Sequence, residues 1–167
     1  MTTTVMTSEA GLVGGLVTFR IGAREYATRL DDVREVVRLQ GLADLPGMRP
    51  PLAGVLDLRG DALPVLDLRG PREHGTDGGD VLVLAGSLPA LSGAEVSGGA
   101  LVGVAVDEVR AVLPADELVP AGTGDAGVLP SYVVQVLRGP DGVVFLVDLE
   151  RMVQAARGSF AERRERY

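Results

Sequence analysis

The stretch Gly54-Val-Leu-Asp-Leu-Arg-Gly-Asp-Ala-Leu-Pro-Val-Leu-Asp-Leu68 decides the fold of this chain. Two short apolar runs flank the pair Gly60-Asp61, which suits a two-residue hairpin loop because glycine readily takes the positive φ of a type II′ turn. Pro64 lacks a backbone donor, so it favours an edge or bulge position over a central strand. The stretch therefore predicts a β-hairpin.

The alternation of side chains assigns two faces to this hairpin. Leu52, Leu56 and Leu58 fall on one face of the first strand, and Val55, Asp57 and Arg59 fall on the other. Leu66 and Leu68 share one face of the second strand, opposite Val65 and Asp67. We therefore expect an arginine and several carboxylates on a face that is not purely core.

Composition favours a packed β protein. The chain has 167 residues, enough for one full domain or two small, closely joined ones. Hydrophobic residues make up 46% and aromatic residues only 4%, so Val, Leu and Ala must form most of the core. Short Val- and Leu-rich runs between Gly and Pro favour strands over helices.

Charge and residue types exclude several classes of function. The net charge of −7 argues against a nucleic-acid binder or a protein that binds acidic membranes. Cysteine and lysine are both absent, which excludes thiolate zinc sites, cysteine nucleophiles, Schiff bases and P-loops. The single histidine, His74, has no local catalytic partner, and the aspartates of the hairpin fit no calcium loop. We expect no enzyme activity, no metal and no cofactor.

The chain divides into a lead, a central region and a tail. Residues 1–15 are expected to be a flexible lead without the features of a signal peptide or a membrane span, so a cytoplasmic location is the default. Strands are predicted at 16–21, 25–30, 81–85, 101–106, 133–137 and 143–149, and residues 86–100 are expected to form a mobile loop. Residues 31–37 fit either a helical turn or an irregular strand. Apolar residues from Leu149 onward recur at helical spacing and predict a short C-terminal helix capped by Asp148, and residues 156–167 are expected to form a charged tail.

A weak internal repeat suggests two similar units. Leu30-Asp-Asp-Val-Arg-Glu-Val-Val37 matches Val106-Asp-Glu-Val-Arg-Ala-Val-Leu113, and Arg59-Gly60 with Val65-Leu-Asp-Leu68 resembles Arg138-Gly139 with Leu146-Val-Asp-Leu149. The shared order implies two small β-units of about five strands each, and a sheet of that size protects its edges best by curling into a barrel.

Glu35 and Arg59 are charged residues in apolar surroundings. One interpretation is an intrachain ion pair or ordinary exposed charges. The other is a charged rim beside an apolar groove for a partner. The sequence leaves both open.

The ordered set of segments resembles the CheW-like domain of bacterial chemotaxis coupling proteins over about residues 16–155. The segments are Phe19 to Ala27, Val33-Arg-Glu-Val36, Leu45-Pro, Gly54 to Gly60, Pro64 to Leu68, Gly103 to Val109 and Val144 to Leu149. The resemblance implies an all-β fold of two SH3-like five-stranded β-barrels packed together as intertwined subdomains, with a boundary near residues 70–80. It also implies a non-catalytic adaptor that joins the cytoplasmic tip of a chemoreceptor to the regulatory domain of the histidine kinase CheA, without membrane insertion and with a cytoplasmic location that extends to membrane-associated receptor arrays.

The resemblance also implies which residues meet the partners. Val33, Glu35, Gly54, Leu58 and Arg59 would line or support a receptor groove near the junction of the barrels. Asp61, Ala62 and Leu63, on the first barrel, would contact the kinase. Asp57 stands where the family usually has Asn, so its charge could alter the hairpin or the groove. The alternative is a ligand-sensing β-barrel, or a scaffold of the same family that regulates a two-component pathway other than motility.

Overall fold

The structure, a computed structural model, describes residues 14–44, 46–47, 51–69, 78–84, 101–122 and 129–164, with side chains up to residue 156. The strands are β1 Gly15–Ile21, β2 Arg24–Arg29, β3 Val33–Arg38, β4 Leu52–Leu58, β5 Asp61–Asp67, β6 Asp80–Leu84, β7 Val102–Val106, β8 Glu108–Pro114, β9 Val119–Pro120, β10 Val133–Gly139 and β11 Gly142–Val147. Two 3₁₀ turns, Leu30–Asp32 and Ala115–Glu117, and the helix α1 Leu149–Arg164 complete the set. The predictions for residues 1–13, for His74 and for the whole loop at 86–100 lie outside the described residues.

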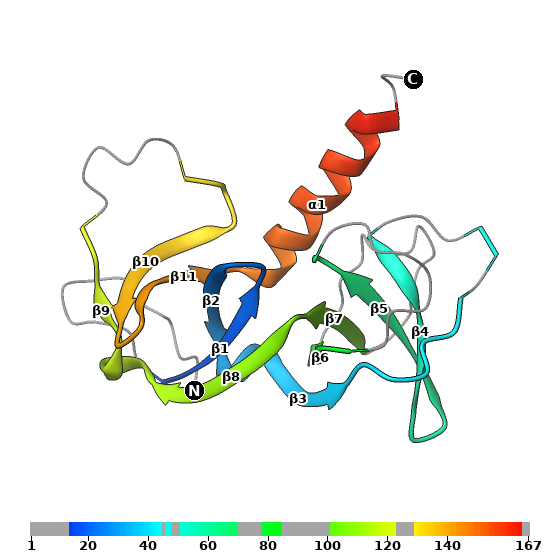
Figure 1. The fold of residues 1–167 in the computed structure, drawn as a ribbon, viewed down its shortest axis with the longest axis horizontal. Coiled ribbons are helices and arrows are strands. Elements are labelled where there is room, and N and C mark those ends of the chain that lie inside the picture. Colours follow the sequence, from blue (N-terminus) through cyan, green and yellow to red (C-terminus); the bar gives the residue numbers. More distant parts are fainter. Residues whose placement is uncertain are drawn as a thin grey trace.

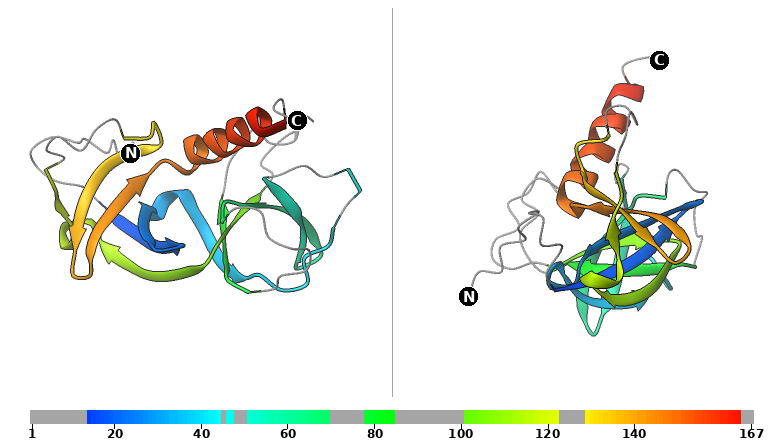
Figure 2. Two further views of the ribbon diagram at one scale, coloured as in Figure 1. Left: turned by 45° about the horizontal axis from the view of Figure 1, so that its top comes forward. Right: turned by 90° about the vertical axis from the view of Figure 1, so that its left-hand side faces the viewer.

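The strands form two curled sheets, which we call barrel A and barrel B. Barrel A has the order β8-β1-β2-β11-β10-β9, in which β9 contributes only two residues, and barrel B has the order β3-β6-β7-β5-β4. The barrels lie side by side, and the N-terminal half of α1 lies over their junction (Figures 1 and 2). The prediction of a mostly β fold with two five-stranded units and a C-terminal helix is confirmed.

The two sequence repeats exchange strands. The first repeat supplies β1 and β2 to barrel A and β3, β4 and β5 to barrel B, and the second repeat supplies β6 and β7 to barrel B and the rest to barrel A. Both barrels have the same strand order, because β3, β6, β7, β5 and β4 correspond to β8, β1, β2, β11 and β10. Residues 70–80 lie between β5 and β6, which are both in barrel B. They therefore separate the repeats but not the barrels, because each barrel takes strands from both repeats.

Three hydrophobic clusters hold this arrangement, so several strands bury both faces. One cluster fills barrel B and includes Leu56, Leu63 and Val65, and another fills barrel A around Leu137. The third, which we call the central core, lies between the barrels and includes Phe19, Leu66, Leu82, Val104 and Val153. β5 shows why the predicted two faces were too simple, because Val65 and Leu66 point to opposite sides and are both buried.

The β4–β5 hairpin forms as expected, but its turn comes one residue earlier. Leu58 pairs with Asp61, so the two-residue loop is Arg59-Gly60. Both residues have positive φ, +51° and +87°, which makes the turn type I′ and not the predicted type II′. The sequence suggested Gly60 as the first loop residue because arginine rarely adopts the left-handed region.

Pro64 lies in an interior strand, contrary to the expectation of an edge. β5 runs between β4 and β7, but its ladder with β7 begins only at Val65. In a two-residue hairpin, hydrogen-bonded pairs alternate from the pair beside the loop, which puts Pro64 opposite Val55 in a non-hydrogen-bonded pair. No ladder bond to β4 is therefore lost at Pro64.

The ambiguous segment after β2 becomes a 3₁₀ turn followed by a strand. Leu30–Asp32 makes the turn, and β3 then enters barrel B. In the second repeat the chain passes from β7 through the single residue Asp107, without a 3₁₀ turn, into β8, which the sequence did not identify as a strand. The repeated Asp-x-Val-Arg pattern thus marks the two points where the chain crosses between barrels.

The C-terminal helix is longer than expected. Asp148 Oδ1 accepts a hydrogen bond from the backbone N–H of Arg151 at 3.2 Å, which is the predicted cap. Leu149, Met152 and Val153 bury this end of α1 in the central core. The helix continues to Arg164, so it includes most of the segment 156–167 that we expected to be a tail.

Candidate functional site

Glu35 and Arg59 form a bidentate ion pair on barrel B. Arg59 Nη2 donates to Glu35 Oε1 at 2.6 Å, and Nη1 donates to Oε2 at 3.1 Å. Glu35 belongs to β3 and Arg59 to the turn between β4 and β5, and β3 and β4 are the two edge strands of the sheet. The pair therefore joins the edges of the curled sheet.

This pair is exposed, and its electrostatics favour the charged forms of both residues. The Arg59 side chain is 70% exposed and that of Glu35 28%. The hydrogen bond from Arg59 lowers the pKa of Glu35 below its ordinary value, and the nearby Arg34 acts in the same direction. The same bond raises the pKa of Arg59. The guanidinium thus presents a fixed positive group at the surface, held in the plane of one carboxylate.

The backbone of Arg59 is unusual. Among the described residues it is the only one other than glycine with positive φ. Such a conformation costs energy for a residue with a Cβ, and strained residues of this kind cluster at functional sites. An asparagine or glycine would suit the turn better, so the arginine at this position points to a role beyond turn formation.

The other residues of the predicted receptor set are Gly54, Leu58 and Val33. They lie buried or partly buried in β3 and β4, the strands beside the ion pair. Gly54 is buried in β4, where an added Cβ would lie 2.6 Å from the carbonyl oxygen of Ala43. Leu58 is buried in the core of barrel B, and Val33 packs against the central core. The structure thus brings Glu35 and Arg59 into contact and places the other three in or against the cores.

The residues predicted to contact the kinase also divide into exposed and buried ones. Asp61 and Ala62 are exposed, and Asp61 lies close enough to Arg59 to raise its pKa. Leu63 is 1% exposed and belongs to the core of barrel B, so its side chain cannot meet a partner directly. The outer face of the hairpin instead presents Val55 and Pro64, both half-buried, beside Ala62. The sequence missed these two because it treated their strand face only as non-core.

Asp57 has a local role in this hairpin. Its Oδ1 accepts a hydrogen bond from the N–H of Gly60 at 2.8 Å, which stabilises the turn. An asparagine side chain has a carbonyl oxygen at the same place and could accept the same bond. The departure from the family's usual residue therefore adds a charge without changing what the turn requires.

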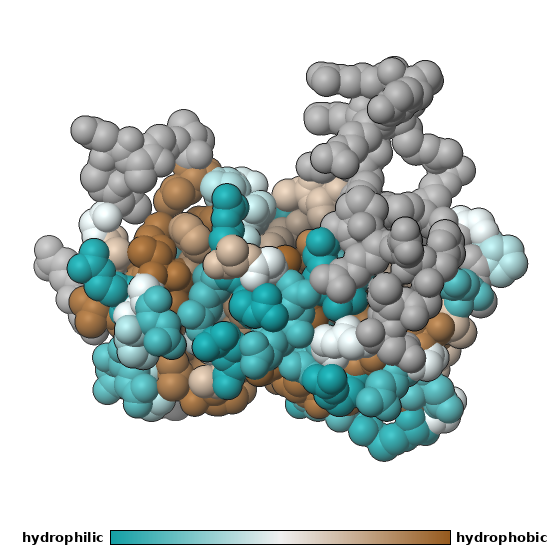
Figure 3. All heavy atoms as spheres, viewed as in Figure 1, coloured by the Kyte–Doolittle hydropathy of each residue, from teal (hydrophilic) through white to brown (hydrophobic). Residues whose placement is uncertain are grey.

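Barrel A carries an exposed apolar surface that sequence reasoning did not single out. Val134 of β10 and Val143 of β11 are 47% and 48% exposed, and Val119 of β9 is 61% exposed. Register places Arg138 between Val119 and Val143. Figure 3 shows hydrophobic atoms over β10 and β11. The sequence did contain a signal for this surface. Valines occur on both faces of these strands, and one of the two faces meets solvent.

Two kinds of feature are absent from the part of the chain that the structure describes. They contain no cluster of three or more His, Cys, Asp or Glu that could hold a metal ion. Within the same residues, no helix is long and apolar enough to cross a membrane. The chemistry that the Glu35–Arg59 pair and the β4–β5 hairpin can perform is recognition by charge and shape.

Comparisons with known proteins agree with this architecture. The CheW-like domain family matches residues 15–157. The chemotaxis protein CheW of Bacillus subtilis is 34% identical over 64 residues, and the match spans 38% of this chain and 41% of that protein's length. The crystal structure of the scaffolding protein TtCheW from Thermoanaerobacter tengcongensis superposes with a TM-score of 0.60 at 20% identity, over 86% of this chain and 90% of the other, and so shows the same fold of two SH3-like barrels. Because the family match covers nearly all of the strands and the start of α1, this chain belongs to the CheW-like domain family.

Proposed function

We propose that this protein is a non-catalytic chemotaxis adaptor that couples the cytoplasmic tip of a chemoreceptor to the regulatory domain of the histidine kinase CheA. The observation that carries the proposal is the exposed, bidentate Glu35–Arg59 pair on a strained turn, in a chain of the CheW-like family. A partner-facing charge explains why an arginine occupies a turn position that favours glycine.

The receptor site is built around Arg59. Glu35 and Arg59 provide the polar contacts, and Val33, Gly54 and Leu58 hold β3 and β4 in place beneath them. Arginine is common at the centres of protein interfaces because its planar group makes several directed hydrogen bonds. Part of the guanidinium remains accessible, since the side chain is 70% exposed although it is paired.

The kinase site is the outer face of the same hairpin. Asp61 and Ala62 are exposed there, and Leu63 supports them from the core. Val55 and Pro64 add partly exposed apolar area next to Ala62, as the centre of a small interface requires. The two proposed sites are therefore neighbours on one hairpin, with Arg59 at its tip.

A charge-swap experiment tests the receptor site. Binding of the full chain to a receptor-tip fragment and to the CheA regulatory domain is measured by calorimetry for the wild type, Arg59→Glu, and Arg59→Glu combined with Glu35→Arg. We expect Arg59→Glu to lose receptor binding, and the double variant to restore the ion pair but not the binding. Recovery of binding in the double variant would show that the pair acts only within the chain. If the wild type binds neither the receptor-tip fragment nor the CheA regulatory domain, the proposal is refuted.

A second variant tests the kinase site. Ala62→Arg places a bulky charge on the outer face of the hairpin and should weaken kinase binding while receptor binding persists. Ala23→Arg is the matched control, because Ala23 is also an exposed alanine but lies in the β1–β2 turn of barrel A. Equal effects of the two variants on kinase binding would remove Ala62 from the site.

No specific observation favours the alternative of a ligand-sensing barrel. The interior of barrel B is occupied by its own buried side chains, which include Leu39, Leu56, Val65 and Val81. A CheW-like scaffold in a pathway other than motility would use the same surfaces, and the binding experiments with chemotaxis partners separate the two cases.

A further inference from the structure

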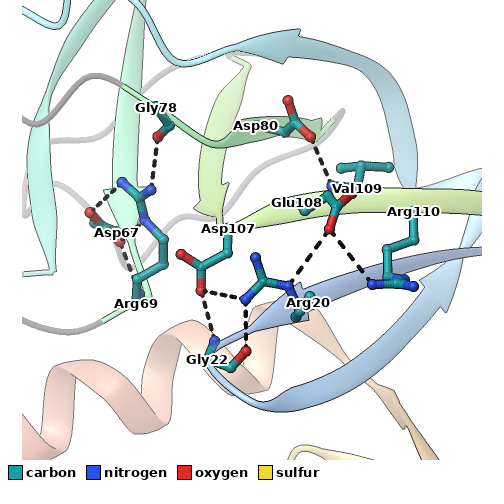
Figure 4. Close-up of polar contacts among 10 residues, drawn as sticks. All are labelled: Arg20, Gly22, Asp67, Arg69, Gly78, Asp80, Asp107, Glu108, Val109 and Arg110. Carbon is teal, nitrogen blue, oxygen red and sulfur yellow. Dashed lines mark hydrogen bonds and ion pairs between the residues drawn. The ribbon is translucent and has the colours of Figure 1, made fainter.

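The junction of the barrels contains a polar cluster that the proposed interfaces do not use. Asp80 opens β6 in barrel B and is 9% exposed. Its Oδ2 accepts a hydrogen bond from the backbone N–H of Val109 at 2.8 Å, and its Oδ1 accepts one from Arg38 Nη1 at 3.1 Å. Val109 belongs to β8 of barrel A, and Arg38 ends β3 of barrel B. One carboxylate thus joins strands of both barrels (Figure 4).

The hydrogen bond from Val109 to Asp80 satisfies a backbone N–H group of β8. This strand lies at the edge of barrel A and pairs only with β1, so its other side has no strand partner. The carboxylate of Asp80 supplies an acceptor from the neighbouring barrel. A charged acceptor strengthens such a bond, and the direction of the N–H group restricts how the two barrels can be oriented.

Two further contacts hold the ends of β6 and β7 at this point. Asp107 is the residue at which the chain crosses into β8. Its carboxylate accepts a hydrogen bond from the N–H of Gly22 at 2.7 Å, and its own N–H donates to the carbonyl oxygen of Arg20 at 3.0 Å. Arg69 is 2% exposed at its side chain, binds Asp67 through two nitrogens and donates to the carbonyl of Gly78 at 2.9 Å. The segment that carries Asp80 is therefore itself firmly positioned (Figure 4).

The central core alone does not restrict the relative orientation of the two barrels in this directional way. It joins the barrels through aliphatic side chains such as Leu66, Leu82 and Val104, and apolar packing has no directional preference of its own. Hydrogen bonds between the barrels select one orientation among those that bury a similar apolar area. Arg38 and Asp80 are also partners in the ladder between β3 and β6, and β3 carries Val33 and Glu35.

We propose that Asp80 is a positioning residue that sets the orientation of β3 and barrel B relative to barrel A, and thereby shapes the receptor groove. The second part rests on the proposed function, because it assumes that the receptor contacts the junction. Loss of the Asp80 carboxylate should leave both barrels folded, widen the range of their relative orientations and lower receptor affinity. The proposed kinase residues Asp61, Ala62 and Leu63 do not pack against the central core, whereas Val33 of the proposed receptor set does, so kinase affinity should persist.

Distance measurement between the barrels provides the test. The chain contains no cysteine, so Ala62→Cys on β5 and Val143→Cys on β11 place one spin label on each barrel. Pulsed electron resonance then gives the distribution of distances in the full chain. We expect a broader distribution for Asp80→Ala. We also expect a distribution close to that of the wild type for Asp80→Asn, which keeps an oxygen for the N–H of Val109.

Matched controls separate positioning from charge and from stability. Asp141→Ala removes the same charge from the exposed β10–β11 turn and should change nothing. Denaturation of each variant reports stability, and Asp80→Asn keeps the test informative if Asp80→Ala fails to fold. An unchanged distance distribution in folded Asp80→Ala, or equal broadening in Asp141→Ala, would overturn the proposal.

Binding to unlabelled chains completes the experiment. The apparent affinity of Asp80→Ala for the receptor tip should fall about three- to tenfold, in proportion to the fraction of molecules that keep the competent orientation. An equal loss of kinase binding would contradict selective positioning. If the wild type binds neither partner, the proposed function fails, but the distance distributions still decide whether Asp80 sets the orientation of the barrels.

Discussion

Gly54→Ala should destabilise the protein through one close backbone approach. A Cβ at this position would lie 2.6 Å from the carbonyl oxygen of Ala43 and 2.7 Å from Leu42 Cγ. Real Cβ contacts are essentially never shorter than 3.0 Å, so the Ala43 carbonyl must retreat by about 0.4 Å or more. That carbonyl accepts the N–H of Val55 at 2.9 Å, and the N–H of Ala43 binds the Val55 carbonyl at 2.9 Å. The pair of hydrogen bonds that joins Ala43 to Val55 of β4 would therefore have to deform.

The expected cost follows from this geometry. Overpacking a rigid site typically costs about 1–3 kcal/mol, and backbone atoms cannot adjust as a flexible side chain can. For a chain of this length, a loss of about 2 kcal/mol lowers the Tm by about 4–8 °C. Urea denaturation and thermal unfolding, both followed by circular dichroism, measure the change in the free energy of unfolding.

Gly122→Ala is the matched control for this prediction. A Cβ there meets no atom within 4 Å, and the backbone is not left-handed. That variant should be as stable as the wild type or slightly more stable, because alanine reduces the entropy of the unfolded chain. If Gly54→Ala unfolds at the same urea concentration as Gly122→Ala, the close approach does not limit this position and the reasoning is wrong.

Three further predictions concern other parts of the fold. The stabilising contribution of Glu35 should be fully present above its ordinary pKa of 4.5 and should be lost as the pH falls through its lower pKa in the folded protein, because the Arg59 bond requires the carboxylate. The stability difference between wild type and Glu35→Gln, measured by urea denaturation across this range, should therefore shrink on acidification; a constant difference would contradict it. Asp148→Ala should cost about 0.5–2 kcal/mol and increase hydrogen exchange in the first turn of α1, whereas unchanged exchange would show that the cap contributes nothing. Leu66→Ala should cost about 2–5 kcal/mol in a single cooperative transition, because Leu66 belongs to the central core shared by both barrels; separate transitions would mean that the barrels unfold independently.

Local pattern was enough to predict the fold class and most of the strands, but β8 and β9 were missed and β3 was left ambiguous. Val17, Phe19 and Ile21 alternate within the strand predicted at 16–21, and they pack in or against the central core. The repeat predicted two units with the same order of strands. It could not reveal that the units exchange strands, because strand order depends on pairings between residues far apart, such as the parallel pairing of β5 with β7.

The candidate site was predictable in its residue types but not in its geometry. The sequence left an ion pair and a partner-facing charge as alternatives for Glu35 and Arg59, and the structure shows a pair that is also exposed. The contact spans 24 residues and depends on the curl of barrel B, which no local pattern encodes. The burial of Leu63 was missed for a related reason, since both faces of β5 are covered and alternation cannot distinguish such a strand from a half-buried one.

The exchange of strands between the repeats has a consequence for synthesis on the ribosome. Barrel B is incomplete until β7, which ends at Val106, and barrel A is incomplete until β11, which ends at Val147. The chain through Val106 must leave the exit tunnel before barrel B has all its strands, and the chain through Val147 before barrel A does, so neither sheet can be completed early in synthesis. For the same reason, two fragments divided between β5 and β6 would each lack strands of both barrels. Such fragments should remain unfolded alone and regain the fold only by complementing one another.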